Sequence, residues 1–280
     1  MIERYVRFEI DGRIGFGRLS EENVEVIRGD IFADFEVTEE FRELSEVRLL
    51  APCQPGKIVA LGMNYRDHAA ELGFAIPGDP LIFLKPGTAV TGPDAPIVYP
   101  RMSTRVDYEA ELGVVIGKKA RFVPAAGAFD VILGYTCVND VTARDLQKKD
   151  VQFTRSKSFD TFAPIGPCIA RGLDPSSLKV ESYLNGKLRQ SSNTSNLIFG
   201  VPELVEFISS VMTLLPGDII STGTPSGIGP MVPGDTVEIV VEGIGTLRNR
   251  VLSDALFRIS ECGFRIEKSG RRHPARLAES

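Results

Sequence analysis

The chain has 280 residues, with 32 basic and 37 acidic side chains that give a formal net charge of −5 at pH 7. Hydrophobic content of 43% and charged content of 25% are typical of a folded globular protein and exclude wholesale disorder. The acidic balance argues against a nucleic-acid-binding protein, which needs a basic face, and the 27 glycines and 18 prolines favour a turn-rich, β-rich body.

Targeting and membrane signals are not expected from the sequence. Residues 1–10 are charged throughout and lack the apolar stretch of a signal peptide. The longest apolar runs, such as residues 80–84 and 112–116, fall far short of the ~20 residues that a membrane helix needs. The four cysteines are widely spaced and are interpreted as reduced thiols. We therefore expect a cytoplasmic protein with neither a membrane nor a nucleic-acid partner.

The N-terminal residues are predicted to form a small β unit. Apolar and polar residues alternate over residues 6–10, and Asp11-Gly12 is typical of a tight turn that leads into a returning strand. Thr38 is predicted to cap a short helix over residues 39–44. A Pro- and Gly-rich cluster then indicates a boundary near residue 56.

Short strands separated by loops are predicted for most of the remaining chain. Apolar runs of strand length cover residues 58–61, 81–84, 111–116 and 131–138. Asn185-Gly186 is a strong hairpin signal, and Pro-Gly-Asp turns at residues 216–218 and 233–235 each precede a strand. Only residues 204–215 repeat apolar side chains at helical spacing. Helices and strands do not alternate regularly, which argues against a Rossmann fold or an α/β barrel.

Several common catalytic motifs are missing from the sequence. It contains no phosphate-binding P-loop, no dinucleotide-binding glycine motif and no Gly-x-Ser-x-Gly elbow. Only two histidines occur, His68 and His273, and the second lies in the polar C-terminal tail. A zinc site with two or three histidines is therefore excluded, and a serine triad would have to use His68 as its base.

Three acidic residues form a candidate metal site. Glu109 and Glu111 stand two residues apart in a predicted strand, so their side chains project from the same face. Asp140 follows a second apolar strand, from which its carboxylate can reach the same place. Three carboxylates without histidine or cysteine form an oxygen-only site for Mg²⁺, Mn²⁺ or Ca²⁺. The alternative is a strand end with two solvated glutamates.

His68 and Glu71 form a candidate catalytic pair. In a helix that begins after Gly62, residues three apart share one face, so the carboxylate can orient the imidazole as a general base. The alternative is an exposed histidine beside an acidic residue. A glycine-rich loop over residues 221–230 offers backbone N–H groups and the Thr224 hydroxyl to an anionic ligand, although such turns are common between strands.

Together these stretches resemble the fumarylacetoacetate hydrolase family over residues 56 to about 253. The matching stretches are residues 62–71, 83–86, 107–112, 139–145, 157–162 and 222–227. The resemblance implies a β-rich α+β fold: a mixed β-sandwich roll of the family's C-terminal-domain type, preceded by a small N-terminal β domain. It divides the chain into residues 1–55, the catalytic domain over residues 56–253 and a C-terminal extension over residues 254–280. It further implies a homodimer.

The resemblance also assigns roles to individual residues. The residues that match the family's metal ligands are Glu109, Glu111 and Asp140. Those that match its catalytic residues are His68, Glu71 and Lys157. Those that match positions lining the substrate pocket are Tyr65, Arg66, Gln147 and Thr224. Without the resemblance, Lys157 would be interpreted as a surface charge.

The activity that this family resemblance implies is metal-dependent cleavage of a C–C bond in acylpyruvate-type diketo acids such as fumarylpyruvate, with Mg²⁺ or Mn²⁺ as cofactor. His68 would activate a water molecule, and the departing enolate would be stabilised by the cation and Lys157. Isomerisation of hydroxyhepta-dienedioate, or decarboxylation or tautomerisation of oxaloacetate, would pass through the same enolate. A non-catalytic metal-binding protein is the alternative from a different functional class.

Overall fold

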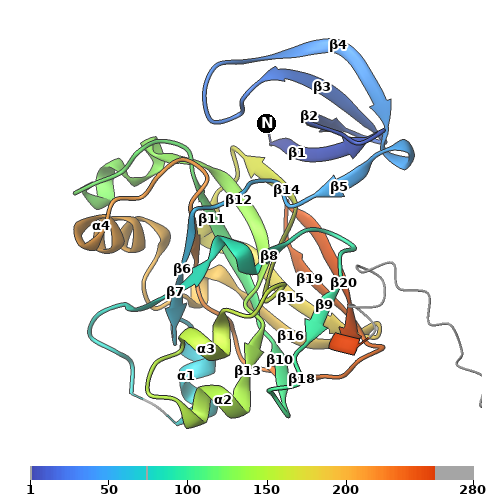
Figure 1. Ribbon diagram of the computed structural model, residues 1–280. Coiled ribbons are helices and arrows are strands. Elements are labelled where there is room, and N and C mark those ends of the chain that lie inside the picture. The colour runs from blue at the N-terminus through green and yellow to red at the C-terminus, as the bar shows by residue number, and fades with distance from the viewer. Residues whose placement is uncertain (1, 74, 256–280) are drawn as a thin grey trace, which may run out of the picture.

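The computed structural model describes residues 2–73 and 75–255, and it consists mainly of strands, as predicted (Figure 1). The N-terminal part is an antiparallel meander, at the top of the view. Its strands are β1 (Glu3–Ile10), β2 (Arg13–Ser20), β3 (Asn23–Gly29), β4 (Phe35–Glu43) and β5 (Arg48–Leu50). The predicted Asp11-Gly12 turn joins the first two strands, with positive φ angles of 49° and 73°.

The helix predicted after Thr38 is wrong, because this segment forms β4. The Thr38 hydroxyl donates a hydrogen bond across the sheet to the carbonyl of Val26 (2.9 Å). Phe35 and Val37 also pack against buried residues, so pairing with β3 and apolar burial outweigh the local helix signal. A 3₁₀ turn over Leu44–Glu46 then leads toward β5.

One long sheet runs through the N-terminal part and the body of the protein. Its order is β4-β3-β2-β1-β14-β12-β11-β17-β6-β7, with β5 on β1 and β8 on β14. The body strands are β6 (Lys57–Gly62), β7 (Leu81–Pro86), β8 (Val90–Thr91), β11 (Ala110–Ile116), β12 (Ile132–Asn139), β14 (Ala163–Arg171) and β17 (Ile219–Ser221). The division into residues 1–55 and 56–253 remains a proposal, because β1 continues the hydrogen-bonded sheet into β14.

A second, five-stranded sheet packs against this long sheet. It has the order β16-β15-β19-β20-β9, and its strands contact β11, β12 and β14. Its strands are β9 (Ile97–Tyr99), β15 (Lys179–Leu184), β16 (Lys187–Asn193), β19 (Thr236–Val241) and β20 (Gly245–Ser253). Leu112, Val114, Ile239 and Leu247 are among the fully or almost fully buried core residues between the two sheets. The β-sandwich roll predicted from the sequence is therefore confirmed.

Short elements close one end of this sandwich. A small sheet combines β10 (Val106–Tyr108), β13 (Thr142–Ala143) and β18 (Gly229–Met231). Three short helices, α1 (Arg66–Leu72), α2 (Arg144–Lys149) and α3 (Thr154–Lys157), lie at the same end, in the lower part of Figure 1. Further 3₁₀ turns cover Gly87–Ala89, Ala125–Asp130, Pro175–Ser177 and Thr194–Asn196.

The remaining helix, α4 (Val201–Val211), ends earlier than its apolar pattern predicts. Glu203 accepts a hydrogen bond from the Gly200 N–H (2.7 Å) and stabilises the helix start. Met212 is already extended, because the chain leaves the helix so that Leu214 can pair with Ala120. Apolar residues after residue 211 therefore pack in extended conformation rather than on a helical face.

We expect Leu204→Ala in α4 to lower the free energy of unfolding by about 3 kcal/mol, since this fully buried side chain would leave a cavity. Val211→Ala in the same helix is the control and should cost less than about 0.5 kcal/mol, because Val211 is half exposed. Urea denaturation followed by circular dichroism measures both. Equal losses would contradict this packing of α4.

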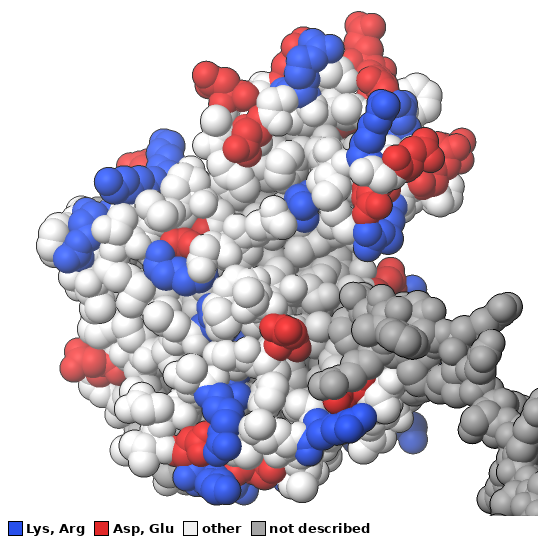
Figure 2. Space-filling model, in the orientation of Figure 1, with Lys and Arg blue, Asp and Glu red and all other residues white. Residues whose placement is uncertain are grey.

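Within the described residues, no helix is long and apolar enough to cross a membrane. Acidic and basic side chains are intermixed on the face shown in Figure 2. Of the C-terminal extension predicted over residues 254–280, residues 256–280 lie outside the described residues.

Candidate metal centre and adjoining pocket

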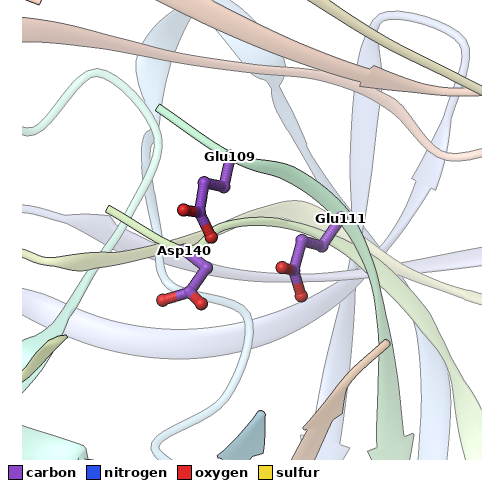
Figure 3. A group of neighbouring side chains, drawn as sticks. All are labelled: Glu109, Glu111 and Asp140. Atoms are coloured by element: carbon purple, nitrogen blue, oxygen red, sulfur yellow. The ribbon is translucent and has the colours of Figure 1, made fainter. Parts of the chain in front are cut away.

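Adjacent strand ends bring the three predicted metal ligands together. Glu109 lies between β10 and β11, Glu111 lies in β11, and Asp140 directly follows β12. Ala110 pairs with Asn139 in register, and the Asp140 N–H donates to the carbonyl of Glu109 (3.0 Å). One carboxylate oxygen from each acid lies within 4.8 Å of the others, and all three side chains are buried (Figure 3). Their geometry fits one shared cation.

Glu111 is the carboxylate of this triad that lacks a cationic partner in the described part of the chain. It accepts hydrogen bonds from the Ser221 hydroxyl (2.5 Å) and the Gly223 N–H (2.9 Å). Burial, followed by the charges of Asp140 and Glu109, raises the pKa of Glu111 to about 8. A divalent cation would relieve this repulsion, and the all-oxygen donor set suits Mg²⁺ or Mn²⁺.

Two buried lysines neutralise the other two acids. The Lys157 ammonium donates to Glu109 Oε2 (2.9 Å) and Asp140 Oδ2 (2.5 Å), so the structure places it at the predicted site. The Lys85 ammonium, fully buried in β7, donates to Asp140 Oδ1 and to the Val141 carbonyl (3.1 Å). The sequence analysis included Lys85 in one of the stretches that match the family, residues 83–86, but assigned it no role. The feature that could have identified it is a lysine within an apolar strand, because a buried charge needs a partner.

Arg144 is a second contact that sequence reasoning missed. Its guanidinium contacts Glu109 and Gln147 Oε1 (2.6 Å), and it also contacts Asp107 Oδ2 (2.9 Å). Burial raises the pKa of Glu109, but the opposing charges of Lys157 and Arg144 outweigh it and hold the pKa at about 2. Glu109 therefore stays ionised at neutral pH.

The predicted His68–Glu71 pair forms on α1. His68 Nδ1 lies 3.1 Å from Glu71 Oε2, and Glu71 also accepts a hydrogen bond from the Gly227 N–H (3.3 Å). The imidazole is buried, whereas the Glu71 side chain is 42% exposed. Within the described residues, nothing hydrogen-bonds His68 Nε2, which leaves that nitrogen for a ligand.

A cavity of about 280 Å³ is lined by one member of the triad, Glu109, and by one member of this pair, His68. It is lined by Leu61, Gly62, Met63, His68, Leu81, Phe83, Glu109, Arg144, Gln147, Lys148, Phe153, Lys157 and Thr224. The Thr224 hydroxyl accepts a hydrogen bond from Gln190 Nε2 (2.8 Å). Five predicted site residues thus share one cavity: His68, Glu109, Gln147, Lys157 and Thr224.

Two predicted substrate contacts lie outside this cavity lining. Arg66 is exposed, and its guanidinium donates to the Leu197 carbonyl. Tyr65 is fully buried, and its hydroxyl has no hydrogen-bond partner among the described residues. Burial, followed by the charge of Glu111, raises the pKa of Tyr65. The structure does not bring Arg66 to the cavity, and both roles stay predictions.

The fold and the site define a β-sandwich protein that joins a buried carboxylate triad to a pocket with a histidine–glutamate pair. Residues 57–252 match the family model described as fumarylacetoacetate (FAA) hydrolase C-terminal, and residues 3–52 match the model described as Rv2993c-like, N-terminal. The chain therefore belongs to the fumarylacetoacetate hydrolase family.

Three relatives show the range of named activities. Oxaloacetate tautomerase YisK of Bacillus subtilis is 46% identical over 223 residues, which cover 74% of this chain and 75% of that protein. The 2-hydroxyhepta-2,4-diene-1,7-dioate isomerase structure from Mycobacterium marinum is 44% identical, with a TM-score of 0.84 over 90% of this chain and 99% of that one. Maleylpyruvate hydrolase from Sphingobium sp. SYK-6, solved with Mn²⁺ and pyruvate, is 32% identical, with a TM-score of 0.75 over 89% of this chain and 99% of that one.

We expect Mn²⁺ to raise the melting temperature of the EDTA-treated protein. An ion at 100 times its dissociation constant adds about 2.7 kcal/mol to the free energy of unfolding. Differential scanning fluorimetry with and without Mn²⁺ measures the shift. Glu111→Gln should remove most of it, whereas Glu181→Gln, which changes a glutamate outside the triad, should keep it. An equal shift in both variants would contradict the metal site.

Proposed function

We propose that this protein is a divalent-metal-dependent isomerase that interconverts enol and keto forms of 2-oxo acids. The observation that carries the proposal is that His68, held by Glu71, faces the same cavity as Lys157 and Glu109. A general base and a cationic group around one cavity are the parts that proton transfer next to a carbonyl requires. The names of the tautomerase and isomerase relatives support this choice.

Each of these side chains has a task in the proposed reaction. Bound Mg²⁺ or Mn²⁺, held by Glu109, Glu111 and Asp140, would supply Lewis acidity to the 2-oxo group. Glu71 holds the Nδ1 side of His68, so in the enol-to-keto direction Nε2 takes the proton from the enol O–H and delivers it to the neighbouring carbon. In the reverse direction it carries the proton from this carbon back to the oxygen. Lys157 uses two N–H groups on the acids, which leaves its third for the developing oxyanion.

Two further residues complete the proposed pocket. Gln147 is oriented by Arg144, and Thr224 is oriented by Gln190. Both line the cavity, so we assign them to substrate contact. Their fixed hydrogen bonds would hold the substrate carbon within reach of His68.

Hydrolytic cleavage of acylpyruvates is the second candidate. It needs the same site together with a water molecule that His68 activates, and the Sphingobium relative is named a maleylpyruvate hydrolase. Tautomerisation or isomerisation ranks first because the relatives with those names are 46% and 44% identical to this chain, against 36% and 32% for two structures named as hydrolases.

Proton NMR with enol-oxaloacetate, acetylpyruvate and fumarylpyruvate tests the proposal, with Mn²⁺-loaded and EDTA-treated protein. The isomerase is supported if the Mn²⁺-loaded protein accelerates the formation of keto oxaloacetate and the EDTA-treated protein does not. Pyruvate and an acid released from either acylpyruvate would establish hydrolysis instead. Loss of CO₂ from oxaloacetate would establish decarboxylation.

We also propose that the protein is a homodimer in the cytoplasm. Cys53, Cys137 and Cys168 are buried free thiols, as expected in a reducing compartment. Light scattering at micromolar concentration should give a mass near twice the 30.6 kDa of one chain. A mass of one chain would contradict the dimer.

A further inference from the structure

We infer that the groove between the N-terminal meander and the body of the protein is a second binding site, which takes an aromatic carboxylic acid. This junction groove has a volume of about 570 Å³ and is lined by side chains from residues 31–35, 117–118, 129–135 and 171–173. Among the described residues, it shares no lining residue with the cavity at the metal centre. The inference therefore does not depend on the proposed function.

The junction groove lies at the opposite end of β11 and β12 from the metal triad. Glu111 lies near the start of β11, and Asp140 directly follows β12. The groove takes Lys118 from beyond the other end of β11 and Ile132 from the start of β12. At ~3.3 Å per residue, the two strands put these ends about 20 Å apart. A ligand in the junction groove would therefore not touch the groups that carry the reaction.

Three segments of the body and one loop of the meander form the groove. The loop joins β3 to β4, and the meander lies above the body in Figure 1. The apolar side chains of the lining are Ile31, Phe32, Phe35, Phe129, Leu133 and Leu173. Phe129 is 56% exposed, so a ligand ring packed against it would remove apolar surface from water. This wall and the groove's volume suit an aromatic ligand.

The charged side chains of the junction groove favour an anion. Lys118 and Arg171 line it and are exposed, and neither forms an ion pair within the described residues. Arg171 interacts with the uncharged hydroxyl of Tyr5, and Asp130 is the acidic side chain of the lining. Two cationic side chains against one acidic side chain give the groove a positive charge that a carboxylate can match.

Tyr135 adds a hydrogen-bond donor between these cations. It lies in β12, which pairs with β11 on one side and with β14, the strand that ends at Arg171, on the other. Its side chain is almost fully buried and lines the groove, yet its hydroxyl has no hydrogen-bond partner among the described residues. Burial, followed by the charge of Asp174, raises the pKa of Tyr135, so the hydroxyl keeps its proton. A carboxylate is the acceptor that satisfies it.

Two probes of the same ring system test this inference by equilibrium dialysis with the Mn²⁺-loaded protein. 2-Naphthoate carries a carboxylate, whereas 2-naphthamide is uncharged. We expect 2-naphthoate to bind about tenfold more tightly, because it gains charge-assisted contacts in a partly exposed groove. The double variant Lys118→Gln/Arg171→Gln should remove this preference and keep the affinity for 2-naphthamide within about twofold. Phe129→Ala should weaken both probes by about threefold.

Two control variants separate the junction groove from other places where a carboxylate could bind. Lys119→Gln changes the exposed neighbour of Lys118, which does not line the groove, and should retain the tenfold preference. Glu111→Gln, which alters the metal triad, should retain it as well. Equal binding of the two probes, or no saturable binding of either, would overturn the inference. A preference that survives the double variant, or that is lost in Glu111→Gln, would also overturn it.

Discussion

Replacing His68 with asparagine is expected to lower kcat for the enol–keto conversion by about 10³-fold. General acid–base catalysis by a positioned side chain contributes ~10²–10⁴-fold. His68 lines the cavity, and its Nε2 has no hydrogen-bond partner in the described residues. Asparagine preserves a polar side chain near Glu71 but cannot exchange a proton at neutral pH. The measurement is the initial rate of keto oxaloacetate formation with saturating Mn²⁺.

The control for His68→Asn is its metal affinity, which should stay within about twofold of the unaltered protein because His68 is no member of the triad. Glu71→Gln keeps the imidazole and should cost only about tenfold, since this partially exposed residue acts by orienting the ring. Unchanged turnover in His68→Asn would show that another group moves the proton. No turnover of any 2-oxo acid by a metal-loaded protein would favour the non-catalytic metal-binding alternative.

The second large effect is expected from Lys85→Met, which removes a buried ammonium from Asp140. The metal-free variant should lose about 3 kcal/mol in its free energy of unfolding, because Asp140 and Glu109 then share Lys157 and the buried acids have one cation fewer. Its affinity for Mn²⁺ should rise about tenfold, because the carboxylate triad then has one cation fewer beside it. The gap between the melting temperatures with EDTA and with Mn²⁺ should therefore widen.

Lys57→Met provides the comparison for Lys85→Met. Lys57 also pairs with a buried acid, Asp218, but this pair lies outside the triad and its cavity. Its loss should lower the melting temperatures of the metal-free and loaded protein equally. If Lys85→Met also lowered the melting temperatures of the metal-free and the metal-loaded protein equally, Lys85 would have only a structural role.

Much of the strand content could be predicted because its signals are local. Alternating side chains mark β1, and the Asn185-Gly186 turn forms as predicted, with φ angles of 51° and 73° that favour these two residue types. The candidate ligands Glu109 and Glu111 were also recognisable, since a spacing of two residues sends both side chains to one side. Asp140 lies beside these two glutamates only because β12 pairs with β11.

The sequence by itself therefore determined the strand-rich class, and it identified the three acids and the His68–Glu71 pair as candidate site residues. Only the tertiary structure decided that Thr38 belongs to a strand, that β1 continues into β14, and that Arg66 turns away from the cavity. It also decided that Lys85 and Arg144 contact the acidic triad. The physical reason is that these features depend on partners far away in the chain, and burial of charge becomes evident only once those partners are in place.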